Sequence, residues 1–126
     1  MGLIQANIKL SNPTNRSLAP VVVKALVDTG ALHLCIPEHI ALQLEVSELE
    51  KRETVLADGR HQLCPYVGPI QVEFDGRRCF VGALVLGDSV LLGAIPMEDM
   101  DLVAIPSHRK VVANPENPNI PLSTVK

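Results

Sequence analysis

Aromatic side chains and long apolar runs are both scarce in this sequence of 126 residues. It contains one Tyr, two Phe and no Trp, has no basic run, and carries a formal net charge of -3. Because this composition gives no nucleic-acid footprint, we expect no nucleic-acid partner. No stretch approaches the ~20 apolar residues of a membrane span, and the N-terminus lacks the charged-then-apolar layout of a signal peptide. We therefore expect a cytoplasmic protein without membrane contacts.

Cysteines are few and irregularly spaced. Cys35, Cys64 and Cys79 are an odd number, which argues against a disulfide framework and a zinc knuckle. We expect them to be reduced core residues. His33 and His39 lie six positions apart without a matching carboxylate, so we predict no metal site and no cofactor. A hydrolase that uses a Cys–His pair stays open as an alternative, although no local signature supports it.

Internal repeats and low-complexity segments are absent as well. A chain of this length can bury roughly two-thirds of its unfolded surface around a single core. We expect one domain over residues 1–113. Residues 114–126 are Pro-rich and polar, which predicts an arm or a disordered end.

Short apolar segments separated by turn residues fill most of the chain, and this pattern predicts a mostly β fold with one or two short helices. The turn pairs Asp58-Gly59 and Asp75-Gly76 each predict a hairpin. Pro65 and Pro69 are expected to break strand pairing, and residues 45–51 fit either a continued helix or a polar loop. Strands are predicted at residues 5–10, 19–27, 34–36, 53–57, 61–64, 70–74, 78–85, 90–93, 101–105 and 110–113, and helices at residues 37–44 and 96–100.

The motif Asp28-Thr29-Gly30-Ala31 stands where the apolar segment 21–27 ends. A carboxylate at the mouth of a buried strand needs hydrogen-bond donors to stay ionised, and the backbone N–H groups of a tight turn can supply them. Gly30 lets the backbone approach the carboxylate without a Cβ in the way. Taken alone, the motif fits an ordinary Asx-type turn equally well.

A second motif, Val90-Leu91-Leu92-Gly93, follows at a distance and closes another apolar segment. The combination resembles the retropepsin-like (clan AA) aspartic proteases over about residues 3–112. Ile36-Pro37-Glu38 and Ala57-Asp58-Gly59 are similar to stretches of the bacterial cytoplasmic branch of that family. The resemblance implies a single-lobe acid-protease β-barrel in which the aliphatic-Gly motif packs under the catalytic loop of Asp28, Thr29 and Gly30.

The resemblance also implies an assembly and a substrate. Aspartic peptidase chemistry needs two carboxylates that share a proton, and the sequence has no second Asp-Thr-Gly or Asp-Ser-Gly. We therefore expect a homodimer, with the N-terminal strand and one late strand at the subunit seam. The substrate is expected to be an extended peptide or protein segment, apolar around the cut bond, lying under a flap formed by the hairpin at Asp58-Gly59. The substrate-binding residues implied are Ala31, Leu32, Val55, Ala57, Asp58, Gly59, Leu91 and Leu92.

Two positions depart from the retroviral pattern. Leu32 and Ala94 stand where retroviral enzymes commonly carry an acidic residue and an Arg that form an ion pair beside the dimer seam. The flap turn is also less Gly-rich. These departures keep a second interpretation open, namely a catalytically weak or inactive module of the same fold that dimerises or binds peptides.

Overall fold

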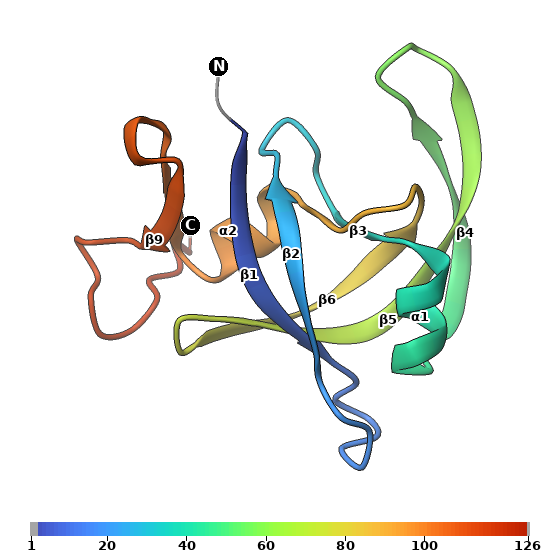
Figure 1. Ribbon diagram of the computed structural model, residues 1–126, viewed down its shortest axis with the longest axis horizontal. Helices are drawn as coiled ribbons and strands as arrows, with labels where there is room; N and C mark the ends of the chain where they lie inside the picture. Colours follow the sequence, from blue (N-terminus) through green and yellow to red (C-terminus); the bar gives the residue numbers. More distant parts are fainter. Residues whose placement is uncertain (1–2, 126) are drawn as a thin grey trace.

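One curled β-sheet dominates the structure, a computed structural model that describes residues 3–125 (Figure 1). Its strand order is β1-β2-β7-β3-β6-β5-β4, and β1 also pairs with β5. This extra pairing closes the sheet into a barrel, and β4 pairs with the first part of β5, ahead of the residues that pair with β1. A separate two-stranded sheet contains β8 and β9. The prediction of a mostly β barrel with short helices is therefore confirmed. The elements are β1 (Ile4–Ser11), β2 (Val21–Val27), β3 (Leu34–Ile36), α1 (Glu38–Leu44), β4 (Ser47–Val55), β5 (His61–Phe74), β6 (Arg77–Val85), β7 (Leu91–Leu92), α2 (Ala94–Asp99), β8 (Leu102–Ile105), the 3-10 turn η1 (Pro106–His108) and β9 (Lys110–Ala113).

The opening hairpin follows the two-residue alternation of its sequence. Ala6, Ile8 and Leu10 of β1 are buried, and the residues between them face solvent. Strand β2 pairs antiparallel to β1 over its full length. In the connection, the Asn12 side chain donates to the carbonyl of Leu44 at 2.9 Å and so ties the turn to the end of α1.

Helix α1 begins after Pro37, which occupies the N-cap position, and buries Ile40 and Leu44. It ends at Leu44 because Glu45 adopts a left-handed conformation (φ 53°). Strand β4 begins at Ser47. Residues 45–51 therefore neither continue the helix nor form a long loop, but enter an edge strand almost at once.

Strand β5 corrects one of our predictions. Pro65 and Pro69 were expected to break the pairing, yet the strand runs continuously from His61 to Phe74. Pro65 lies opposite Lys51 of β4, while the ladder with β6 begins only at the next residue. The register shifts between Val67 and Ile70, so the second proline falls in an irregularity of the ladder. Proline is tolerated at such bulges because the ladder is already interrupted there.

The closing half of the chain brings the second motif to the first. Strand β7 pairs parallel to the end of β2, with Leu26 opposite Leu91 and Val27 opposite Leu92. Helix α2 follows directly and starts at Ala94, two residues before the predicted position. Within the described residues, no helix is long and apolar enough to cross a membrane.

The segment that follows β9 is attached to the barrel at Asp101. Its carboxylate accepts hydrogen bonds from the side chains of Asn114 and Asn117 and from the Leu122 N–H, at 2.7–3.0 Å. The buried guanidinium of Arg77 donates to the carbonyls of Met100, Asp101 and Asn117. Segment 114–122 is thus attached to the barrel, while the division of the chain at residue 113 stays a prediction.

Candidate active site

Asp28 follows the last residue of β2, with its side chain exposed to solvent. Its own N–H donates to the carbonyl of Leu92 at 3.0 Å, which extends the pairing of β2 with β7 by one step. The carboxylate Oδ1 accepts the N–H of Gly30 at 2.9 Å, and the Ala31 N–H donates to the carbonyl of Asp28 at 3.1 Å. The acidic side chain is therefore held by a tight turn at the end of a strand that pairs on both sides.

The second motif packs directly under this turn. A Cβ built on Gly93 would lie 2.3 Å from the carbonyl oxygen of His33 and 2.8 Å from that of Ala31, so only glycine fits. Just beyond it, the Ala94 N–H donates to the Ala31 carbonyl at 2.8 Å and the Ile95 N–H to the Leu32 carbonyl at 2.9 Å. The start of α2 thus fixes the loop of Asp28 from below.

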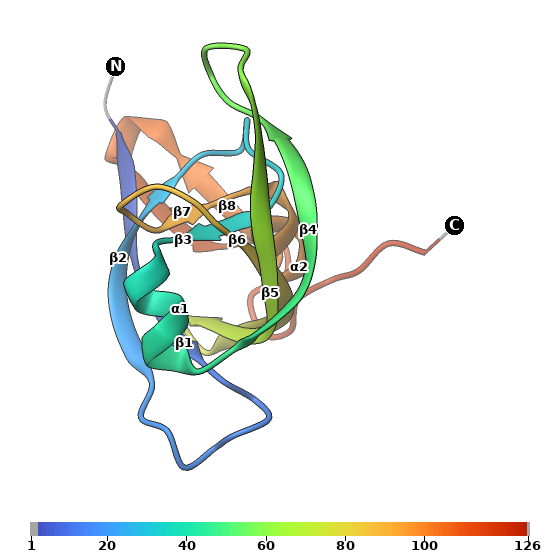
Figure 2. The ribbon, with the colours of Figure 1, turned by 90° about the vertical axis from the view of Figure 1, so that its right-hand side faces the viewer.

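A cavity of about 480 Å³ opens beside Asp28. The hairpin of β4 and β5 borders it on one side, and Figure 2 shows that hairpin reaching beyond the barrel near the loop that follows β2. Most of the wall is aliphatic, so the cavity suits an apolar group next to a carboxylate. The lining residues are Asp28, Gly30, Ala31, Leu32, His33, Cys35, Glu53, Thr54, Val55, Leu56, Ala57, Leu84, Leu86 and Leu91.

The structure brings most of the predicted site residues together. Besides Asp28 and Gly30, the cavity wall includes the predicted residues Ala31, Leu32, Val55, Ala57 and Leu91. Four others do not line it. Thr29 is exposed on the loop, Leu92 is fully buried beneath it, and Asp58 and Gly59 lie at the exposed tip of the hairpin.

The hairpin tip has its own hydrogen bonds. The Leu56 N–H donates to the carbonyl of Arg60 at 2.8 Å, and the Gly59 N–H to that of Leu56 at 2.9 Å. The backbone N–H of Arg60 and then its guanidinium donate to the Asp58 carboxylate, and these bonds lower the pKa of Asp58. The tip is therefore a hydrogen-bonded turn in which Arg60 already pairs with the carboxylate of Asp58.

Several cavity residues were not predicted. His33 and Cys35 follow the motif at alternate positions, and that spacing could have placed both on one face of the segment. Leu84 and Leu86 reach the cavity only because β6 pairs parallel to β3, with Cys35 opposite Leu84. No short sequence pattern predicts the register between β3 and β6. Glu53 and Thr54 belong to the predicted hairpin arm, but nothing in the sequence tells which side faces the cavity.

The electrostatics of the cavity disfavour a thiol nucleophile. Burial, then Cys64 and then Asp28, raise the pKa of the Cys35 thiol. Burial and then Arg52 lower the pKa of His33. Both shifts oppose the thiolate–imidazolium pair that a Cys–His hydrolase needs. Among the described residues, no group of three or more His, Cys, Asp or Glu could hold a metal ion.

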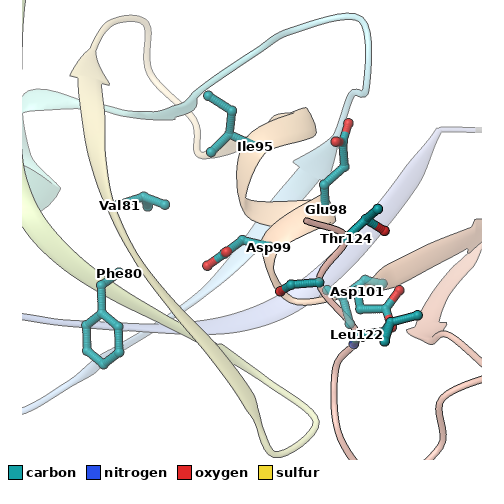
Figure 3. Close-up of a pocket in the computed structure, with 10 residues that line it drawn as sticks. Phe80, Val81, Ile95, Glu98, Asp99, Asp101, Leu122 and Thr124 are labelled. Atoms are coloured by element: carbon teal, nitrogen blue, oxygen red, sulfur yellow. Dashed lines mark hydrogen bonds between the residues drawn. The ribbon is translucent and has the colours of Figure 1, made fainter. Parts of the chain in front are cut away.

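A larger cavity, about 650 Å³, lies elsewhere, between β6, α2 and segment 122–124 (Figure 3). Glu98, Asp99 and Asp101 all line it, so three carboxylates are present there. The carboxylate of Asp101, however, already accepts the hydrogen bonds that hold the end of the chain. These bonds, together with the charge of Arg77, lower the pKa of Asp101. Among the described residues, neither Glu98 nor Asp99 has a side-chain hydrogen bond that would fix its carboxylate as the Gly30 N–H fixes that of Asp28.

Comparison with solved structures identifies the fold. EIAV protease complexed with the inhibitor HBY-793 is similar to this chain at a TM-score of 0.60, with 18% sequence identity over 82% of this chain and 93% of that chain. No protein-family model matches the sequence, and no curated protein matches it either. At this identity the similarity shows the fold alone, so the chain has a retropepsin-like fold.

Proposed function

We propose that the protein is a homodimeric aspartic endopeptidase of the retropepsin-like family, in which each subunit contributes one Asp28. One observation carries the proposal. The exposed carboxylate of Asp28 is held at the end of a paired strand, over a glycine that admits no Cβ, and beside a cavity bordered by a hairpin. A fold that needed only a turn would not require an acidic group at the edge of an aliphatic cavity.

The chemistry follows from two such carboxylates. Repulsion between like charges keeps one proton shared between the pair. The ionised Asp28 takes a proton from water, whose oxygen bonds to the peptide carbonyl carbon, while the protonated Asp28 of the other subunit gives its proton to the carbonyl oxygen. When the tetrahedral intermediate collapses, the C–N bond breaks and the amine nitrogen receives a proton.

The dimer is required because one described chain offers only one such loop. A two-fold axis places each residue near it opposite its own copy, so an Asp28 at the axis would face Asp28 of the second subunit. The small sheet of β8 and β9 buries Leu102 and Val111 in the core but, in the described part of the chain, pairs with no strand of the barrel sheet, so its edges carry backbone groups that another strand can meet. We propose β1 and this hairpin as the subunit seam. Because Leu32 and Ala94 cannot form an ion pair beside it, the dimer is expected to be weak.

The substrate is expected to be an extended peptide segment between the flap and the barrel. Ala31, Leu32, Val55 and Leu91 present aliphatic surface to the cavity, so apolar side chains are expected around the cut bond. Three free cysteines fit a reducing compartment such as the cytoplasm. The stretches Ile36-Pro37-Glu38 and Ala57-Asp58-Gly59 support placement in the bacterial branch.

The test is cleavage of a mixed peptide library over about pH 3–8, with Asp28→Asn as the inactive variant and Asp88→Asn, at an exposed loop position, as the matched control. The wild type and Asp88→Asn should cut with a bell-shaped profile on the acidic side of neutrality, because the dyad titrates as a pair. Asp28→Asn should not cut. Equal cleavage by Asp28→Asn would contradict the proposal, as would a wild type that binds peptides without cutting them.

Subunit mixing tests the dimer separately. Wild type and Asp28→Asn are unfolded together in equal amounts and refolded, so that subunits reassort at random. If both carboxylates are needed, activity should be about one quarter of that of the same total amount of wild type. If one carboxylate per dimer suffices, about three quarters should remain, and about half if each subunit acts independently; either result would overturn the shared dyad.

A further inference from the structure

Three side chains from distant parts of the chain form a cluster beside the candidate active site. The guanidinium carbon of Arg52, from β4, lies 3.8 Å from the ring centroid of Tyr66, from β5. The ring of His33 meets that of Tyr66 edge-on, with centroids 5.7 Å apart and planes inclined by 67°. We name Arg52, Tyr66 and His33 the Tyr66 cluster. It joins the base of the flap to the end of the Asp28 loop.

The neighbouring strand leaves space for this cluster. A Cβ built on Gly82 of β6 would lie 2.2 Å from Cζ of Tyr66 and 2.3 Å from its hydroxyl oxygen. The tyrosine ring therefore fills the space that a side chain at residue 82 would need, which is why this position is a glycine. Arg52 is also held by Glu50, whose carboxylate accepts its Nε–H at 2.7 Å. Since both neighbours are fixed, the Tyr66 ring has a defined position against which His33 packs.

The backbone of His33 is fixed as firmly as its ring. Its carbonyl oxygen packs against Gly93, and the two residues before it bond to the start of α2 through their carbonyls. The half-buried ring lines the cavity next to Asp28. His33 thus presents a positioned imidazole to whatever occupies the cavity.

Other polar side chains of the cavity wall are already engaged. The Asp28 carboxylate accepts a hydrogen bond from a backbone N–H at 2.9 Å, and we propose it as the catalytic group. Glu53 meets the ring of a histidine outside the cavity at 2.5 Å, and the Thr54 hydroxyl donates to a backbone carbonyl at 2.9 Å. Cys35 offers only a weak donor. Within residues 3–125, the His33 ring has no hydrogen-bond partner, and its lowered pKa arises from burial and from Arg52.

The charges around the ring select the chemistry of a ligand. Burial and then Arg52 lower the pKa of the imidazole and so favour its uncharged form, which offers one donor and one acceptor. A carboxylate ligand would be repelled by Asp28 and Glu53, which line the cavity. An ammonium group has donors only and cannot accept the N–H of the imidazole, whereas a carboxamide can both donate and accept.

We infer that His33 is a specificity-determining residue that hydrogen-bonds an Asn or Gln side chain of the substrate, and that Tyr66 and Arg52 are positioning residues that fix its ring. This inference rests on the proposed endopeptidase. It adds a polar requirement to a cavity that is otherwise aliphatic, so the preferred substrate combines an apolar residue with a nearby carboxamide.

The kinetic test uses extended peptides that carry either Asn or its near-isostere Leu, with the pair placed at each position around the cut bond. At one position the wild type should prefer Asn by about three- to tenfold in kcat/KM, mainly through KM, as one hydrogen bond provides. His33→Leu should lose this preference while still cutting the Leu peptide. Tyr66→Leu should weaken it, and Tyr66→Phe, which keeps the ring, should restore it.

A second measurement separates this inference from the proposed function. Asp28→Asn protein, which should not cut, is titrated with the same peptides while the imidazole signals of His33 are followed by NMR. The Asn peptide should bind more tightly than the Leu peptide and shift those signals, whether or not the wild type proves to be a protease. Equal affinities with unmoved His33 signals, in protein with an unchanged unfolding curve, would overturn the inference.

Discussion

Replacing Gly93 by alanine is the sharpest test of how the candidate site is built. The added Cβ would lie 2.3 Å from the His33 carbonyl oxygen and 2.8 Å from both the Ala31 carbonyl oxygen and the Leu32 carbonyl carbon. These are backbone atoms, which cannot rotate away as a side chain can. The loop that holds Asp28 must therefore shift away from α2.

The size of the effect can be worked from the contacts. Overpacking of a filled interior costs about 1–3 kcal/mol. The shift also stretches the hydrogen bonds from the Ala94 and Ile95 N–H groups, now 2.8 and 2.9 Å, each of which contributes about 1 kcal/mol. We expect Gly93→Ala to lose about 3 kcal/mol of unfolding free energy, a large share of the usual 5–15 kcal/mol.

The measurement is urea unfolding together with peptide cleavage. Gly76→Ala is the matched control, because Gly76 sits in the turn after β5 at φ +78° with no atom near its Cβ position. That change costs about 1–2 kcal/mol through backbone strain alone, yet it should leave cleavage by the folded protein unchanged. Gly93→Ala should reduce cleavage even where it is fully folded. Wild-type stability and activity in Gly93→Ala would refute the account of how the loop is supported.

Two further predictions concern the anchor of the chain end. Arg77→Met should lower the unfolding free energy by about 2–3 kcal/mol, because three carbonyls lose a charged donor, and thermal unfolding should shift down by about 10 °C; an unchanged transition would show that these bonds are not stabilising. The folded pKa of Asp101 lies below its ordinary value, so its contribution is present above about pH 4 and is lost as the pH falls further. Asp101→Asn should therefore flatten the acid side of a stability–pH curve, whereas Asp88→Asn should leave that curve as in the wild type; identical curves for the two variants would contradict this assignment.

Much of the fold could be predicted because local chemistry and tertiary structure agree. Asp58-Gly59 and Asp75-Gly76 form their hairpin turns, and the alternation along residues 5–10 corresponds to one buried face. The exceptions are β4, which begins at Ser47 where a helix or a loop was expected, and β5. Proline normally ends a strand, but Pro65 pairs with only one neighbour and Pro69 falls in a bulge. Neither circumstance is visible before the neighbouring strands are known.

The candidate site divides in the same way. The loop of Asp28 and its support by Gly93 could be predicted from two motifs. The turn needs an acidic residue followed by a glycine, and the close packing beneath the turn needs a second glycine. The contact of His33 with the Tyr66 ring and the position of Leu84 could not be predicted, because the first depends on a ring from β5 and the second on the parallel pairing of β3 with β6. Long-range register is a property of the folded chain and leaves no short pattern in the sequence.

The parallel pairing of β2 with β7 has a consequence for biosynthesis. Asp28 leaves the ribosome early, but the carbonyl that receives its N–H and the glycine beneath its loop are among the later residues to emerge. Long-range contacts of this kind form slowly and only once both partners exist. A nascent chain, or a product of premature termination, thus carries Asp28 without the architecture around it, and the site that we propose to be catalytic can form only after Gly93 has been synthesised.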